Sequence, residues 1–167
     1  MAADLTLRHA TVPTPFGPFT IAMSPEGVVA TTTGEPSELV DELARRLGTV
    51  SRAAALRAAT RDLQRYLSGD RGPFRTPVDL RLVGTPFARD VLEVTRTIPF
   101  GEMWTYGDVA AAAGRPGAAR AAGSALAHCP IELFVPCHRV VPAGPGLGAY
   151  GGADDRRVTL LRHEHAI

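Results

Sequence analysis

The sequence predicts an α+β protein with a small N-terminal α/β lobe over residues 1–80 and a mainly helical C-terminal lobe over residues 81–167. Three observations predict it. Short β-prone runs surround a Pro/Gly turn near the N-terminus, a Gly- and Pro-rich break interrupts the chain at residues 72–77, and helical signals dominate after that break. A length of 167 residues fits one domain or two small lobes that share a core.

The N-terminal lobe is expected to hold a short antiparallel sheet and two helices. Residues 19–23 and 28–33 are β-prone and are separated by the turn sequence Ser-Pro-Glu-Gly at 24–27, which favours a hairpin. Two amphipathic helices are expected next, over residues 36–47 and roughly 51–67, because leucines recur there at helical spacing and a glycine follows each stretch.

Capping signals predict two helices of the C-terminal lobe. Thr85 is a candidate N-cap, and Pro86 suits the first helical position because its missing N–H would be unpaired there anyway. This helix should end before Pro99, since the residue that precedes a proline avoids the α region. Asp154 is a candidate cap for a last helix that runs through Glu164.

A helix-turn-helix pattern lies between these two helices. Thr105 and Asp108 have the spacing of a capping box, with Asp in place of the usual Glu or Gln, and predict a short helix over residues 106–113. Gly-Arg-Pro at 114–116 breaks it, and an Ala-rich helix is expected over residues 117–127. Many such helix pairs do not bind DNA, so the pattern by itself does not establish a nucleic-acid interface.

Composition narrows the function classes. The chain has 18 basic and 17 acidic residues, so its net charge of +1 argues against a strongly basic nucleic-acid binder. Every basic residue is Arg, and the chain contains no Lys and no Asn, which a GC-rich coding bias explains. No membrane-spanning run or secretory signal is visible, and two cysteines cannot build a disulfide framework. We therefore expect a cytoplasmic protein.

The candidate nucleophile is Cys137. It lies in the apolar, β-prone run Phe-Val-Pro-Cys-His-Arg-Val-Val at 134–141, between Pro136 and His138. A thiolate is the reactive form of cysteine, and a nearby cation or base favours its formation. In a strand, adjacent side chains point to opposite faces, so the imidazole would act on the thiol through a bridging water. The alternative is a buried, inert cysteine in a hydrophobic strand.

Two other sites are less well supported. Cys129, Cys137 and the histidines beside them do not have the spacing of a zinc site, so no metal is expected. The Gly-rich run at 144–152 lacks the lysine and the pattern of a phosphate-binding loop, which leaves a tight loop over the site as the better interpretation.

Four motifs, taken in order, carry a resemblance to a known family. They are the helix-turn-helix Thr-Tyr-Gly-Asp-Val with Gly-Ala-Ala-Arg-Ala-Ala-Gly, then Pro-Cys-His-Arg-Val at 136–140, Gly-Ala-Tyr-Gly-Gly at 148–152 and Leu-Leu-Arg-His-Glu at 160–164. Together they resemble the O6-alkylguanine-DNA alkyltransferases, also called methylated-DNA–protein-cysteine methyltransferases. The resemblance covers residues 86–164 and extends weakly to Pro-Thr-Pro-Phe-Gly-Pro at 13–18.

The resemblance implies a DNA repair protein that acts once. Such a protein flips O6-alkylguanine, mainly O6-methylguanine, out of duplex DNA and transfers the alkyl group irreversibly to its own Cys137. It needs no cofactor, binds double-stranded DNA through the minor groove and acts as a monomer. The fold expectation therefore includes a helix-turn-helix and an active-site cysteine loop in the C-terminal lobe.

The resemblance also implies a role for each matched residue. Cys137 would accept the alkyl group, His138 would take its proton through a water, and Glu164 would orient the imidazole. Tyr106 would protonate the leaving guanine, and Arg120 would fill the space left by the flipped nucleotide. Further residues are expected to contact DNA or to line the base pocket. The DNA contacts are Ala119, Ala121, Arg139 and Tyr106 itself, and the pocket residues are Pro136, Val140, Tyr150 and Gly151.

The sequence departs from the family at two of these places. Cys129 stands at the hinge position, where the family usually has Asn, and Gly151 stands where a Ser is common. A first alternative is therefore a non-catalytic or slow alkylated-DNA binding protein with an altered hinge. A second is a cysteine hydrolase that uses Cys137, His138 and Glu164, for which the sequence offers no oxyanion hole.

Overall fold

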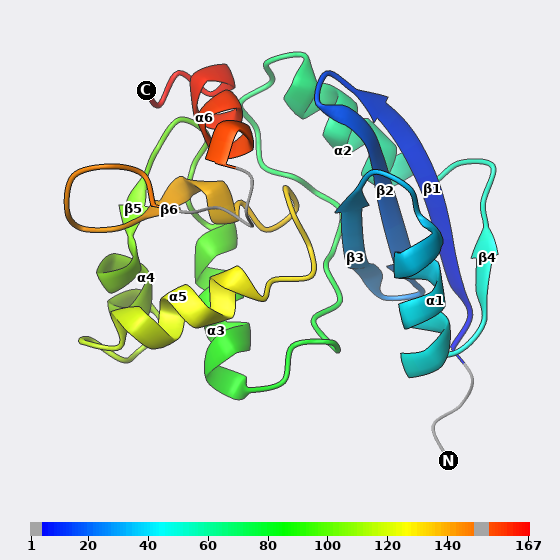
Figure 1. Ribbon diagram of the computed structural model, residues 1–167, viewed down its shortest axis with the longest axis horizontal. Coiled ribbons are helices and arrows are strands. Elements are labelled where there is room, and N and C mark those ends of the chain that lie inside the picture. The colour runs from blue at the N-terminus through cyan, green and yellow to red at the C-terminus, as the bar shows by residue number, and fades with distance from the viewer. Residues whose placement is uncertain (1–4, 149–153) are drawn as a thin grey trace. The chain divides into compact units, whose positions relative to one another are not determined.

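The structure, a computed structural model, describes residues 5–148 and 154–167 (Figure 1). The chain divides into two compact units. The first unit takes the chain up to Asp70, then Phe74–Leu82 and Pro130–Phe134. The second unit takes Arg71–Pro73, Val83–Cys129 and Val135–Ile167. The five residues Pro130–Phe134, which lie shortly before Cys137 in the sequence, thus belong to the first unit.

The first unit is built on a four-stranded sheet in the order β3-β2-β1-β4. Its strands are β1 (Leu7–Thr14), β2 (Gly17–Ser24), β3 (Gly27–Thr33) and β4 (Val50–Arg52). The expected hairpin is confirmed as the antiparallel pair β2–β3, while β4 pairs in parallel with β1. The prediction of a helix from about residue 51 is wrong at its start, because that stretch first pairs with β1 as a strand.

Two helices complete the first unit. The helices are α1 (Ser37–Arg46) and α2 (Arg57–Leu67). Leu43 of α1 is buried in a core cluster with Leu7 of β1 and Val29 of β3, so the apolar face of α1 packs on the sheet as its leucine spacing predicted. Asp62 of α2 is buried as well. Its carboxylate accepts hydrogen bonds from the backbone N–H groups of Arg75 and Thr76, at 2.8 and 2.7 Å.

The second unit is mainly helical. Its elements are α3 (Pro86–Arg96), β5 (Trp104–Thr105), α4 (Tyr106–Ala112), α5 (Ala119–Ala127), the 3-10 helix η1 (Cys137–Arg139), β6 (Val140–Val141) and α6 (Asp154–His163). In Figure 1, α4 and α5 lie next to one another, and α3 lies against α5. The strands β5 and β6 form a small parallel sheet.

Two of the three predicted caps are confirmed, at Thr85 and at Thr105 with Asp108. The Thr85 side chain accepts a hydrogen bond from the N–H of Ala88, and α3 ends before Pro99. Thr105 and Asp108 form both bonds of the capping box, at 3.1 and 2.9 Å. The helix-turn-helix of α4 and α5 is therefore defined by the local signals that predicted it. Asp154 is the first residue of α6, and its side chain lies outside the described residues.

The strand expected around the cysteine is wrong. Cys137–Arg139 form one turn of 3-10 helix, and only Val140–Val141 pair as a strand. The Arg139 N–H donates to the carbonyl of Pro136 at 3.0 Å, which closes the turn. A 3-10 helix has about three residues per turn, so neighbouring side chains are separated by about 120° and not by the 180° of a strand. Among the described residues, no helix is long and apolar enough to cross a membrane.

Candidate active site

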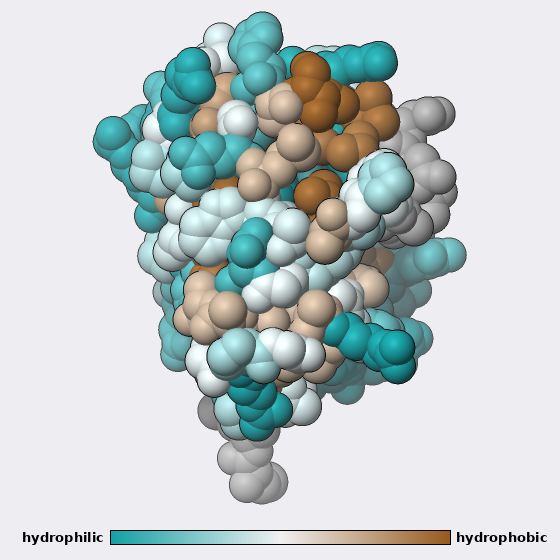
Figure 2. Space-filling model, turned by 90° about the vertical axis from the view of Figure 1, so that its left-hand side faces the viewer, coloured by the Kyte–Doolittle hydropathy of each residue, from teal (hydrophilic) through white to brown (hydrophobic). Residues whose placement is uncertain are grey.

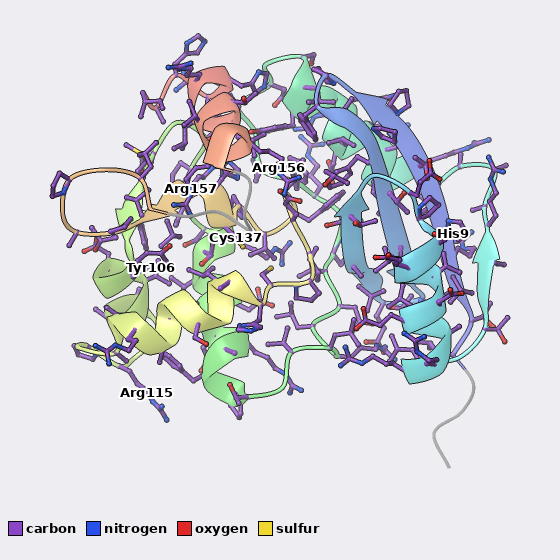
Figure 3. The ribbon with its side chains drawn as sticks, viewed as in Figure 1. His9, Tyr106, Arg115, Cys137, Arg156 and Arg157 are labelled. Carbon is purple, nitrogen blue, oxygen red and sulfur yellow. The ribbon has the colours of Figure 1, made fainter. Side chains whose placement is uncertain are left out.

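Cys137 is the first residue of η1. It is buried, with 6% of its surface exposed, and its N–H donates to the carbonyl of Val135 at 2.8 Å. Pro136 before it and Val140 after it are also buried, and Val140 is fully so. The turn thus holds the thiol in an apolar setting (Figure 3).

His138 and Glu164 form a buried pair, and neither side chain has an exposed surface. The Nε2 atom of His138 lies 2.6 Å from Oε1 of Glu164. An ionised carboxylate can only accept, so Nε2 carries the proton and the lone pair of the neutral ring is on Nδ1. Nδ1 is buried and has no hydrogen-bond partner among the described residues. This nitrogen is therefore available to accept a proton.

Arg139 does not lie where the sequence suggested. Its Nε and Nη2 atoms donate to the two carboxylate oxygens of Glu164 at 2.9 and 3.0 Å, and Nη1 donates to the carbonyl of Ile98 at 2.7 Å. Only 9% of the residue is exposed. The expectation that Arg139 contacts DNA is corrected, because a buried carboxylate requires a paired cation and Arg139 is that cation.

The backbone at Gly101 completes the surroundings of Glu164. The Gly101 N–H donates to Oε2 of Glu164 at 3.2 Å. Gly101 has a φ of +84°, and a Cβ at this position would lie 3.1 Å from the backbone carbonyl oxygen of Glu164. Gly101 and Ile98 are not among the residues that were predicted for the site from the sequence. Their signal in the sequence is weak, because one acts through its backbone N–H and the other through its carbonyl.

These contacts set the ionisation of the pair. Burial lowers the pKa of His138, Arg139 and Arg157 lower it further, and Glu164 partly opposes them. Burial raises the pKa of Glu164, but the hydrogen bonds and charges of His138 and Arg139 outweigh it and lower that pKa to about 2. At neutral pH the site therefore holds a neutral imidazole beside a carboxylate, which suits a general base oriented by its partner.

Several other residues that were predicted for the site lie on the helix-turn-helix. Tyr106 is the first residue of α4, and its ring lies against Gly123 of α5, where a Cβ would be 3.7 Å from the ring. Arg120 is exposed on the first turn of α5. The guanidinium of Arg115, in the turn between the helices, lies 4.9 Å from the ring centre of Phe87, which ties this turn to α3.

The remaining predicted residues are distributed as follows. Ala121 is exposed and Ala119 is half-buried on α5, while Cys129 is half-buried just after that helix. Both cysteines are reduced thiols. Tyr150 and Gly151 lie outside the described residues. In the described part of the chain, no group of three or more His, Cys, Asp or Glu side chains is arranged to hold a metal ion.

The site combines a buried thiol with a buried imidazole–carboxylate pair, and the same unit carries a helix-turn-helix. This combination is typical of a class of proteins that have a reactive cysteine and bind DNA. The chain belongs to the 6-O-methylguanine DNA methyltransferase family. The DNA binding domain of that family matches residues 86–166, and its ribonuclease-like domain matches residues 7–80.

Similar proteins support this assignment over nearly the whole chain. The methylated-DNA–protein-cysteine methyltransferase of Mycobacterium bovis is 38% identical over 164 residues, which covers 95% of this chain and 92% of the relative. The Mycobacterium tuberculosis O6-methylguanine methyltransferase has a solved structure that superposes with a TM-score of 0.79 at 36% identity, covering 96% and 93% of the two chains. A structure of Mycobacterium tuberculosis OGT in complex with DNA gives a TM-score of 0.78 at 37% identity, covering 94% and 92%.

Proposed function

We propose that this protein repairs O6-alkylguanine in double-stranded DNA by moving the alkyl group to Sγ of its own Cys137, once per molecule. The observation that carries the proposal is the buried Cys137 followed by the His138–Glu164 pair, in which Nδ1 of the imidazole is free to accept a proton. The relatives named for this reaction, and the neighbour in complex with DNA, support it.

The reaction begins with the thiol. His138 accepts the Cys137 proton at Nδ1 through a water molecule, and the resulting imidazolium is stabilised by the Glu164 carboxylate that receives its Nε2–H. The thiolate donates its electron pair to the sp³ carbon of the alkyl group. As the new S–C bond forms, the bond between that carbon and O6 breaks, and its electron pair leaves with the guanine.

Tyr106 assists the leaving group. Its hydroxyl gives a proton to the ring nitrogen of the guanine as the O6–carbon bond breaks, so the guanine leaves as a neutral base. The tyrosinate is then reprotonated through solvent by the proton that His138 took from Cys137. The packing of its ring against Gly123 fixes Tyr106 at the junction of α4 and α5. The product is a thioether, which does not hydrolyse at neutral pH, so Cys137 remains alkylated and the molecule acts only once.

Access to the alkyl group requires that the nucleotide leaves the stack. Flipping costs a few kcal/mol and is cheaper for a damaged base. Arg120 on the exposed face of α5 fills the gap, since its planar guanidinium stacks on bases, and the small Ala119 and Ala121 let α5 approach the minor groove. Pro136, Val140 and, outside the described residues, Tyr150 and Gly151 form the pocket for the flipped base.

The contact area with DNA is expected to be small. Figure 2 looks onto the side of the molecule that is at the left in Figure 1, and shows hydrophilic and hydrophobic residues interspersed, with hydrophobic ones gathered in the upper part. With a net charge of +1, affinity for DNA is expected to depend on a few well-placed contacts more than on a broad basic surface.

We further propose that the protein acts as a monomer in the cytoplasm, at the nucleoid in a bacterium.

The proposal is tested by measuring how much normal guanine the protein restores in DNA. A duplex with one O6-methylguanine inside a restriction site, which resists cleavage, is incubated with protein below and above equimolar amounts. Cleavable DNA should rise linearly with added protein and stop at one repaired site per molecule. Repair that continues after every protein molecule has reacted would contradict the single-use mechanism, and DNA binding without repair would favour the alternative of a non-catalytic binder.

A further inference from the structure

We propose that Arg157 is a positioning residue that fastens the loop 142–148 to α6 and holds a positive charge beside His138. The inference rests on the proposed function, because the imidazole it acts on is the base of that reaction. Neither the motifs of the sequence nor the comparisons assign a role to this residue.

The first step is the contact with the loop. Arg157 lies in the first turn of α6 and is buried, with 3% of its surface exposed. Its Nη1 atom donates to the backbone carbonyl of Leu147. At Gly148 a Cβ would lie 2.9 Å from Cγ of Pro142 and 3.5 Å from Nη1 of Arg157, and the φ there is +68°. The loop therefore closes on itself at Pro142 and rests on the guanidinium.

The second step is the geometry of α6. Glu164 directly follows the last residue of α6, and its N–H donates to the carbonyl of Leu160 at 3.0 Å, which continues the helical hydrogen-bond pattern. Arg157 and Glu164 are seven residues apart, close to two helical turns, so both lie on the same side of this segment. Glu164 holds His138 and Arg139 of η1, and Arg157 holds the loop that follows β6. The chain from the cysteine turn to Gly148 is thus anchored to the same helix face at both of its ends.

The third step is charge. The charged groups that act on His138 are Arg139 from η1, Arg157 from α6 and Glu164, which directly follows α6, and Cys137 is its neighbour in the chain. Repulsion from the Arg157 guanidinium disfavours the imidazolium and lowers the pKa of His138, in the same direction as Arg139 and against Glu164. Figure 3 labels Arg157 at α6 and Cys137 on η1 in the same part of the second unit. Arg157 thereby helps to keep the base in its neutral form.

Two variants separate these roles. Arg157→Met removes the charge and the hydrogen bond to Leu147, whereas Arg157→Lys keeps a charge but loses the forked guanidinium. Arg162→Met, an exposed arginine on the same helix, is the matched control. For each protein, the rate of single-turnover methyl transfer is measured against pH and against DNA concentration, and the His138 ring is titrated by NMR in the absence of DNA.

Arg157→Met should move the acid limb of the pH–rate profile and the NMR titration of His138 to higher pH, by about half a pH unit. Arg157→Lys should leave both in place. Both variants should need more alkylated DNA for half-maximal rate, roughly threefold or more, because the loop has lost its anchor. The control should match the wild type in every readout.

An unchanged His138 titration in Arg157→Met would overturn the role of the charge, and an unchanged DNA requirement in both variants would overturn the role of the anchor. The NMR titration needs no alkyl transfer. A wild-type protein that fails to repair DNA would therefore contradict the proposed function, while this inference would still be decided by the ring titration.

Discussion

Nε2 of His138 lies 2.6 Å from Oε1 of Glu164, and neither side chain has an exposed surface. This contact fixes the tautomer of the imidazole, so that Nδ1 is the nitrogen left to act as a base. It also places a carboxylate in the core, where Arg139 and the Gly101 N–H provide its remaining hydrogen bonds. Catalysis and stability therefore depend on the same buried charge.

Replacement of Glu164 by Gln should lower both the rate of alkyl transfer and the stability of the fold. The substitution leaves the Arg139 guanidinium buried without its counter-charge, and removing one partner of a buried ion pair costs about 3–5 kcal/mol. The imidazolium formed during transfer also loses its stabilising partner, so the transfer rate should fall. Urea unfolding and single-turnover kinetics measure the two effects. The control is Glu93→Gln, because Glu93 forms an exposed ion pair with Arg96 and should change stability by less than about 1 kcal/mol.

The same pair makes the fold sensitive to acid. The pKa of Glu164 is about 2 in the folded protein, below the ordinary glutamate value of 4.5, so the unfolded chain binds this proton more readily. The free energy of unfolding should therefore fall by about 3 kcal/mol as the pH drops from above 4.5 to 2. The lowered pKa of His138 acts in the same direction, and its effect begins as the pH falls through 6.5, the ordinary histidine value. Unfolding curves at a series of pH values check this, and stability that rises on acidification would contradict it.

Substitution of Gly101 by Ala should destabilise the protein through two effects. The positive φ of +84° is strained for a residue with a Cβ, and that Cβ would lie 3.1 Å from the carbonyl oxygen of Glu164. We expect a loss of about 1–3 kcal/mol in thermal or urea unfolding. Gly69→Ala is the control, because its φ is +91° but a Cβ there meets nothing within 4 Å. Equal losses in the two variants would show that the contact with Glu164 contributes nothing.

Cys129 tests whether the altered hinge limits the reaction. In the family that position usually holds Asn, and here a half-buried thiol follows α5. Cys129→Asn should transfer the methyl group at the same rate as the wild type or faster, measured in a single turnover. A clear loss of rate, in a variant that unfolds at the wild-type urea concentration, would mean that this chain uses the cysteine in a hinge of its own.

The parts of the fold that the sequence predicted well are those decided by local chemistry. The capping box of Thr105 and Asp108 and the cap at Thr85 need only neighbouring residues, and both formed as predicted. The strand β4 could not be predicted in this way, because Val50–Arg52 become a strand only by pairing with β1, more than 40 residues earlier. Pairing with a distant strand therefore outweighed the helical pattern of this segment.

In the candidate site, too, some contacts were predicted correctly and those between residues distant in the sequence were not. The resemblance placed His138 and Glu164 in one site, and the structure brings them together. The role of Arg139 could not be read from its neighbours, since its partners Glu164 and Ile98 are 25 and 41 residues away. An arginine beside a proposed DNA-binding motif suggested a phosphate contact, whereas the need to neutralise a buried carboxylate decided its position.

The most direct test of the account is to locate the transferred methyl group. The protein is reacted with excess duplex DNA that contains O6-methylguanine and is then digested for peptide mass spectrometry, with Cys137→Ser and Cys129→Ser treated in parallel. We expect one added methyl group, found only on the peptide that carries Cys137, present in Cys129→Ser and absent in Cys137→Ser. A Cys137 peptide of unchanged mass after repair, or a methyl group on Cys129, would contradict it.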